Sequence, residues 1–314
     1  MIAVGERLRA ALRERRFAVT AELSPPRGAD PGTIRRAARA LHDWVDAANV
    51  TDNQGAMVRM ASWAGCVLAM NEDVEPIMQL QCRDRNRLAL QADLLGAAAV
   101  GIPNVLLLTG DHQRFGDHPD ARGVFDIDSV QLLWAARTMR ENGRLISGNP
   151  LSPAPSWLIG GVENPFAPPL AFRAERLGKK VAAGAEFVQT QYVFDVPTFR
   201  AWMQASRDLG LTQRCGVLAG VGPIRSLRAL ERMHEIPGIV IPPAVEARLR
   251  AVPPERVLDE SMTICAEIIA ELRGIPDLAG VHVMAFGSED AVREIVERAG
   301  LGRRPHASVN EHVG

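Results

Sequence analysis

The sequence predicts a single-domain (β/α)8 barrel from three observations. Short apolar or β-branched runs alternate eight times with longer Ala-, Leu- and Arg-rich stretches of helical spacing. The chain has 314 residues, which suits one large barrel. No GxGxxG motif follows the first strand, which argues against the alternative, an open doubly wound sheet. Because such alternation implies parallel strands joined by right-handed crossovers, we expect residues 1–303 to form the barrel and residues 304–314 a disordered tail.

Each element is bounded by a change of pattern or by Pro and Gly residues. The expected strands are Phe17–Leu23, Ala47–Thr51, Pro76–Gln81, Asn104–Leu108, Trp157–Val162, Phe187–Thr190, Gly216–Ala219 and Gly280–Ala285. The expected helices are Gly5–Arg15, Gly32–Trp44, Met57–Met70, Arg85–Gly96, Val130–Glu141, Leu170–Ala183, Val196–Leu209, Ile224–Met233, Pro254–Arg273 and Ser288–Ala299. We expect His112–Asp128 to be a long polar loop and Pro237–Glu246 to be irregular.

Composition argues against several classes of protein. The net charge is −1, so bulk electrostatics give no reason to expect a nucleic-acid partner. No apolar run approaches the roughly 18 residues that a membrane helix needs, and Met1 to Arg16 lacks the apolar stretch of a secretory signal. The four cysteines are widely and irregularly spaced, which favours buried free thiols in a reducing cytoplasm: Cys66, Cys82, Cys215 and Cys265.

Polar residues follow several of the predicted strands. In a barrel of this type, function is found where the carboxyl ends of the strands meet their loops. The polar groups at these ends are Glu22, Thr51-Asp52-Asn53, Thr109-Gly110-Asp111 and Gln189-Thr190-Gln191. Closure of the ring would point them toward one mouth, where they form a candidate site.

Two of these residues, Glu22 and Asp111, each have two possible roles. Glu22 lies in a mostly apolar segment, where lost hydration favours the neutral form and suits a general acid; alternatively it caps the barrel by pairing with Arg27 or another Arg. Asp111 follows a Gly that permits a tight turn, so it either binds a donor-rich ring or caps the next segment.

A metal site is not expected. The nearest approach to one is the group His112, Asp117, His118 and Asp120. These residues lie in a polar loop, and their spacing matches no metal-binding pattern.

Taken together, these residues resemble the methylenetetrahydrofolate reductase family over about Phe17 to Phe286. The resemblance is closest to the branch fused to homocysteine methyltransferases and to acetogen-like reductases, whose strand-four motif reads TGD. The segments that carry it are Ala21 to Gly28, Cys82 to Arg87, Leu94 to Asp111, Gly116 to Asp126, Lys179 to Ala185 and Thr190 to Asp195.

The resemblance implies a barrel that holds FAD at its mouth and uses NAD(P)H to reduce 5,10-methylenetetrahydrofolate to 5-methyltetrahydrofolate. It implies that Glu22 is the general acid that protonates the folate nitrogen, and that Asp111 and Gln191 bind the pterin. The positions implied to contact the cofactor are Thr51, Gln79, Thr109, Gly110 and Lys180. The expected partners are folate and a nicotinamide nucleotide, and a homo-oligomer is compatible with this assignment.

Some positions depart from the family pattern. Gln79 stands where many relatives have a flavin-contacting His, and Arg173 and Arg176 stand where an Asp and an Asn are common. Met233 stands where a folate-stacking Phe is expected. These departures keep two alternatives open, which are a folate-binding methyl-transfer component and a non-catalytic partner subunit with an impaired flavin site.

Overall fold

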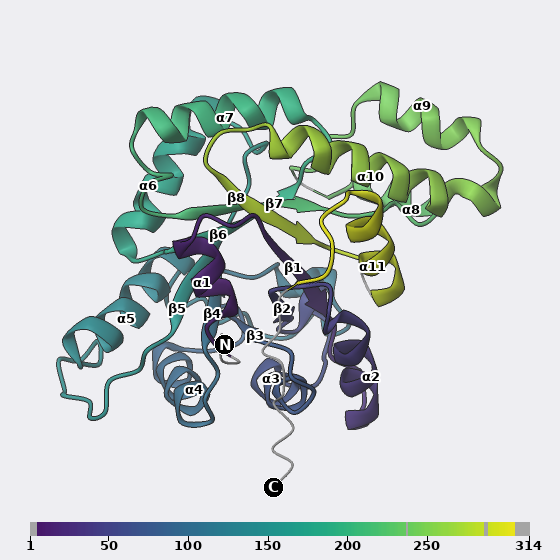
Figure 1. Cartoon of the computed structure of the whole chain (residues 1–314). Coiled ribbons are helices and arrows are strands. Elements are labelled where there is room, and N and C mark those ends of the chain that lie inside the picture. Colours follow the sequence, from purple (N-terminus) through teal and green to yellow (C-terminus); the bar gives the residue numbers. More distant parts are fainter. Residues whose placement is uncertain (1–4, 237, 286–287, 305–314) are drawn as a thin grey trace, which may run out of the picture.

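The computed structural model describes residues 5–236, 238–285 and 288–304. Eight parallel strands form a closed ring in chain order, β1 to β8, and helices surround it (Figure 1). The predicted (β/α)8 barrel is therefore confirmed.

The strands are short and pair in parallel, with shifts of register where β7 meets β6 and β8. They are β1 (Ala18–Leu23), β2 (Ala47–Val50), β3 (Pro76–Gln81), β4 (Asn104–Leu108), β5 (Leu158–Glu163), β6 (Phe187–Tyr192), β7 (Gly216–Val221) and β8 (Leu278–Val283). The ring closes where β1 pairs with β8, with Thr20 opposite His282. Thr20 and His282 therefore lie at the same height in the barrel.

The helices surround the strands: α1 (Arg7–Arg13) closes the amino-terminal end of the ring, and the others lie around its outer face. These others are α2 (Pro31–Leu41), α3 (Ser62–Met70), α4 (Arg87–Ala99), α5 (Ser129–Asn142), α6 (Arg173–Ala183), α7 (Val196–Asp208), α8 (Leu227–His234), α9 (Pro243–Ala251), α10 (Val257–Arg273) and α11 (Glu289–Arg298). Their inward faces pack on the outward-pointing strand residues in one continuous apolar core. The sheet thus alternates between this outer core and the barrel interior.

The interior is apolar at the amino-terminal end of the strands and polar above it. The apolar layer, closed by Leu8 and Ala11 of α1, comprises Ala18, Ala47, Ile77, Leu106, Leu158, Phe187 and Leu218. Phe187 fills the centre because its neighbour is Gly160, where a Cβ atom would lie 2.2 Å from the Phe187 ring. This packed floor confines any ligand to the carboxyl-terminal end of the strands.

Most predicted elements agree with the structure to within three residues at each end, and two predicted segments differ by more. The helix expected at Met57–Met70 begins only at Ser62, because the residues before it form a loop that packs on the loop after β4, with Gly116 tight against the Ala56 carbonyl. The irregular stretch expected at Pro237–Glu246 is wrong in its second half, where Pro243 begins α9. Proline suits this first helical position because its fixed φ and missing N–H cost nothing there.

Three further predictions concern the cysteines, membrane-spanning helices and the C-terminal tail. All four cysteines are buried and unpaired, as predicted. None of the described helices combines the length and the apolarity needed to cross a lipid bilayer. Residues 305–314 of the expected tail lie outside the described residues, whereas Arg304 is buried and its guanidinium lies 3.0 Å from the Asp46 carboxylate.

Candidate functional site

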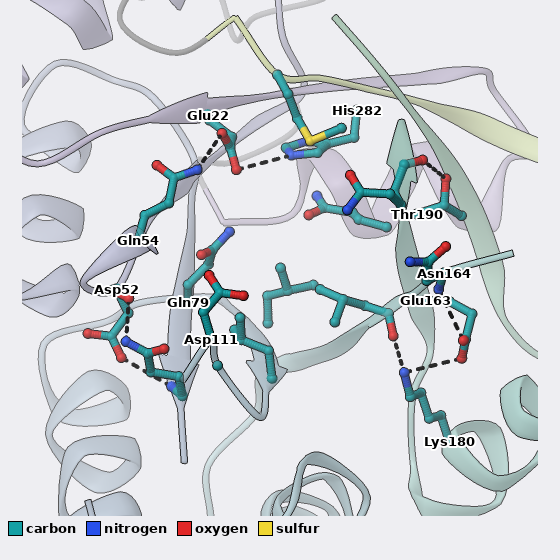
Figure 2. Close-up of a pocket in the computed structure, with 18 of the residues that line it drawn as sticks. Glu22, Asp52, Gln54, Gln79, Asp111, Glu163, Asn164, Lys180, Thr190 and His282 are labelled. Atoms are coloured by element: carbon teal, nitrogen blue, oxygen red, sulfur yellow. Dashed lines mark hydrogen bonds and ion pairs between the residues drawn. The ribbon is translucent and has the colours of Figure 1, made fainter. Parts of the chain in front are cut away.

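A cavity of about 350 Å³ opens at the carboxyl-terminal ends of the strands. Its floor and walls are formed by Glu22, Asp52, Gln54, Gln79, Gln81, Leu106, Leu108, Gly110, Asp111, Val162, Glu163, Asn164, Arg173, Arg176, Lys180, Gln189, Thr190, Gln191, His282 and Met284. The volume is within the range of small-molecule sites, and the lining combines a few aliphatic surfaces with many converging polar groups. Figure 2 shows Glu22 and His282 on one side of it and Lys180 with Glu163 on the other.

Glu22 ends β1 with its carboxyl at the cavity wall. Its side chain is only 7% exposed, and Nε2 of His282 lies 3.8 Å from its Oε1. On the other oxygen, the Gln54 amide donates a hydrogen bond to Oε2 at 3.4 Å. The alternative prediction, that Glu22 pairs with Arg27 or another Arg, is wrong: Glu22 forms no ion pair with an arginine among the described residues, and Arg27 contacts the Met57 sulfur.

Beneath Glu22 lies a layer of hydrogen-bonded polar side chains. Asn49 and Gln189 face each other across the barrel and exchange two amide hydrogen bonds, of 2.5 and 3.0 Å. The Gln189 amide also donates to Thr20 Oγ1 at 3.3 Å, and that hydroxyl lies 2.9 Å from Nδ1 of His282. This layer supports the floor of the cavity with groups whose orientations fix one another.

Asp52 forms a buried ion pair at the edge of the cavity. Its carboxylate accepts from two nitrogens of Arg85, at 2.7 and 3.1 Å, and from the backbone N–H of Gln81. Burial raises the pKa of the Asp52 carboxyl, and Arg85 opposes that rise. Gln81 donates to the Asp52 carbonyl at 2.6 Å, which holds the ends of β2 and β3 together.

Asp111 and Gln191 reach the cavity from the loop after β4 and from β6. Gly110 has a φ of +92°, and a Cβ atom there would lie 2.3 Å from the Gln81 amide oxygen, so only glycine fits this turn. The Gln191 amide oxygen accepts from the N–H of Tyr192 at 3.0 Å. That contact leaves the Gln191 NH2 group as a donor toward the cavity.

The opposite wall, formed by the end of β5 and by α6, is cationic. The Lys180 ammonium lies 3.2 Å from Glu163 Oε2 and also donates to the Val162 carbonyl. Both side chains are almost fully buried, and burial lowers the pKa of Lys180 while Glu163 opposes that shift. Arg176 Nε lies 3.6 Å from the same Glu163 carboxylate, and Arg173 donates to the carbonyls of Ala167 and Pro168.

The structure brings six of the eight predicted site residues to this cavity, namely Glu22, Gln79, Gly110, Asp111, Lys180 and Gln191. Thr51 and Thr109 do not line it. Thr51 is fully buried, and its hydroxyl makes no hydrogen bond with the described residues. Thr109 points outward, because Leu106 and Leu108 take the inward positions of β4, and its hydroxyl accepts from the N–H of Ser129 at 3.2 Å.

Among the departures from the family pattern, Gln79, Arg173 and Arg176 line the cavity. Met233 does not, and packs into the core on α8 instead. Among the described residues, no group of three or more His, Cys, Asp or Glu side chains could hold a metal ion.

Sequence reasoning missed five polar residues that line the cavity: Gln54, Gln81, Glu163, Asn164 and His282. Glu163 ends β5 and therefore carried the same strand-end signal as Glu22. His282 lies inside β8 between Val281 and Val283, and only the two-residue alternation of that strand indicates that it faces the interior.

Comparisons with known proteins agree with this geometry. A model of the methylenetetrahydrofolate reductase family matches residues 7–300. A probable methylenetetrahydrofolate reductase (NADPH) from Caenorhabditis elegans is 24% identical over 94% of this chain and 44% of the relative. Methylenetetrahydrofolate reductase 1 of Schizosaccharomyces pombe is 27% identical over 75% of this chain and 37% of the relative. This chain thus spans less than half the length of these two relatives.

Solved structures share the fold. A Clostridium thermocellum protein, described as binding two copies of 5-methyl-5,6,7,8-tetrahydrofolic acid, has a TM-score of 0.67 at 14% identity, over 94% of this chain and 99% of that one. That likeness supports the barrel architecture. The family match across residues 7–300 shows that the chain belongs to the methylenetetrahydrofolate reductase family.

Proposed function

We propose that this protein reduces 5,10-methylenetetrahydrofolate to 5-methyltetrahydrofolate with NAD(P)H as reductant and a flavin, FAD, as hydride carrier. The observation that carries the proposal is the Glu22 carboxyl, which is 7% exposed at the cavity wall and shares the cavity with Asp111 and Gln191. The names of its relatives, and the folate bound by the Clostridium thermocellum protein, point to the same substrate class.

The side chains that line the cavity suit a flavin. Leu106, Leu108 and Val162 offer an aliphatic surface for a flat ring, and the amide of Gln79 and the backbone at Gly110 can meet its polar edge. The cationic wall formed by the end of β5 and by α6 suits the negative charge of its phosphates. When bound, the flavin supplies the hydride that reduces the one-carbon unit.

Glu22 has the setting of a general acid. Its side chain is 7% exposed, and its oxygens face one amide donor and one imidazole at the cavity wall, where a carboxyl proton can be passed to a bound substrate. Transfer of that proton to a ring nitrogen of the folate would open the five-membered ring and leave an iminium carbon ready for hydride. The resulting carboxylate would then accept a hydrogen bond from the Gln54 amide.

Asp111 and Gln191 would orient the pterin. Its amino and ring N–H groups are donors that match the Asp111 carboxylate, and its carbonyl oxygen matches the free NH2 group of Gln191. Two such contacts would set both the position and the face of the ring, which places the reacting carbon relative to the hydride source.

We also propose a reducing compartment such as the cytoplasm as the location, because all four thiols are unpaired and buried.

The visible spectrum of the purified protein tests this function. We expect a flavin spectrum that NADH or NADPH bleaches and that methylenetetrahydrofolate restores. A colourless protein that takes up no added FAD and still binds folate would instead support the methyl-transfer alternative. Failure to bind either compound would leave the scaffold alternative standing.

A further inference from the structure

Arg173 and Arg176 lie one helical turn apart at the start of α6, and both line the cavity. The Arg173 guanidinium is held by the Ala167 and Pro168 carbonyls, the latter at 2.6 Å from Nη2. The Arg176 side chain is 42% exposed, its only ionic partner among the described residues is Glu163 at 3.6 Å, and it makes no hydrogen bond with them. Both groups therefore have donors left for a ligand.

The cavity wall around them has an excess of positive charge. Among the described residues of the wall formed by the end of β5 and by α6, three cations line the cavity, Arg173, Arg176 and Lys180, beside one carboxylate, Glu163, which contacts Arg176 and Lys180 but not Arg173. The formal charge of these four side chains is therefore +2. Lys180 is largely committed, because its ammonium already contacts Glu163 and the Val162 carbonyl. The excess therefore resides mainly on the two guanidinium groups.

We propose that Arg173 and Arg176 form a phosphate-binding subsite that takes a phosphate group of the nucleotide cofactor bound in this cavity. The inference rests on the proposed function for the presence of such a cofactor.

The chemistry favours phosphate over other anions. A phosphate carries up to two negative charges and several acceptor oxygens, which match two planar guanidinium groups with a net charge of two. The partly enclosed cavity reduces solvent screening of that attraction. The phosphate can belong to the flavin or to the nicotinamide nucleotide, and these two sources can be separated by experiment.

Matched ligand pairs isolate the phosphate contribution. Riboflavin and FMN differ by one phosphate, as do the riboside and the mononucleotide of reduced nicotinamide. Their dissociation constants are measured by equilibrium dialysis for the parent, Arg176→Ala and Lys179→Ala. Lys179 is the control because it lies on the same helix and carries the same charge but is exposed and does not line the cavity.

We expect the phosphate-bearing member of one pair to lose about ten- to hundred-fold in affinity in Arg176→Ala, the scale of hydrogen bonds to a charged group. Its phosphate-free partner should bind unchanged, and Lys179→Ala should behave as the parent does. The pair that responds identifies the source.

If both members of each pair weaken equally, or neither weakens, the subsite is refuted. A loss confined to triglutamate over monoglutamate forms of 5-methyltetrahydrofolate would also refute it, in favour of a carboxylate subsite.

Inorganic pyrophosphate separates this inference from the proposed function. If no flavin or nicotinamide compound binds, the proposed function fails. A rise in Tm with pyrophosphate that is lost in Arg176→Ala and kept in Lys179→Ala would still support the subsite, and no rise in the parent would refute it as well. Arg176→Gln replaces Arg176→Ala if the latter does not fold.

Discussion

The Glu22 carboxyl and the His282 imidazole face each other from adjacent strands of the barrel, with Oε1 3.8 Å from Nε2 (Figure 2). The Asn49 amide nitrogen lies 3.5 Å from the same Nε2, and Thr20 Oγ1 lies 2.9 Å from Nδ1. An imidazole with its hydrogen on Nδ1 can donate to Thr20 and accept at Nε2. In that tautomer Nε2 faces the Glu22 carboxyl, so His282 links the proposed acid to the polar layer beneath it by contact on one side and hydrogen bonding on the other.

Glu22→Gln should separate the two halves of the reaction. The amide keeps the shape of the side chain and its contact with Gln54, but it has no acidic proton to give. We expect oxidation of NADH by a quinone to continue at nearly the parent rate, while folate reduction falls by about 10²- to 10⁴-fold, the usual contribution of a general acid. Stopped-flow measurement of each half-reaction checks this. Equal loss in both would show that Glu22 acts on the cofactor or on folding instead.

His282→Ala should lower turnover more than binding. His282 is almost fully buried and holds one side of the Glu22 carboxyl, so its loss would let that carboxyl shift within the cavity. Displacements of about 1 Å can cost about 10²-fold in rate. We expect kcat for folate reduction to fall on that scale with little change in the folate Kd.

Thr20→Val is the companion variant, because it keeps the imidazole and removes the hydroxyl that contacts Nδ1; that hydroxyl also accepts from the Gln189 amide. Thr20→Val should also lower kcat for folate reduction, by a smaller factor than His282→Ala does. A His282→Ala enzyme with parental kcat would contradict a positioning role for this imidazole.

The parts of the site that sequence reasoning found are those next to a strand end. Glu22, Asp111 and Gln191 each follow a recognisable apolar run, so their position at the mouth depends only on barrel closure. Thr109 satisfied the same rule but points outward, because the direction of a side chain depends on the register of its strand. A shift of one residue in that register could not be read from the sequence.

The polar layer was harder to foresee. His282 and Asn49 lie within strands, and their meeting with Gln189 depends on β2, β6 and β8 facing one another across the closed ring. No local pattern encodes such a contact between strands far apart in the sequence. The start of α9 at Pro243 was missed for a different reason. A proline in the first turn of a helix and a proline within a loop cannot be told apart from the sequence alone.

The amide pair of Asn49 and Gln189 should behave as a coupled unit in stability measurements. Both side chains are almost fully buried, and each amide donates one hydrogen bond to the other. Asn49→Ala leaves the Gln189 amide short of partners and should lower the free energy of unfolding by about 1–3 kcal/mol. Gln189→Met should cost a similar amount.

The double variant Asn49→Leu with Gln189→Met removes both amides and should cost less than the sum of the single changes, Asn49→Leu and Gln189→Met. Urea unfolding of the four proteins measures this coupling. Strict additivity would show that the two amides do not depend on one another.

Asp126 should make the stability of the barrel sensitive to acid. Its carboxylate accepts from the Arg87 backbone N–H at 2.9 Å and from Nε and Nη2 of that residue at 2.8 and 3.0 Å. The Arg87 side chain, and then its backbone N–H, lower the pKa of Asp126 from 3.8 to about 2. Between these two values the unfolded chain binds more protons than the folded one, so the stabilisation is complete above 3.8 and is lost as the pH falls toward 2.

Asp126→Asn should therefore be slightly less stable than the parent at pH 7, and the gap should close as the pH is lowered from about 4 to about 2. The effect is small because the pair is exposed to solvent and screened by salt. Urea midpoints at pH 7, 4 and 2.5 in low salt measure it. Asp120→Asn is the control, since Asp120 lies in the same loop and makes no hydrogen bond or ion pair with the described residues; it should match the parent throughout. A gap that stays constant down to pH 2.5 would mean that the carboxylate charge of Asp126 contributes nothing, and that only the shape of the side chain holds the β4–α5 loop against α4.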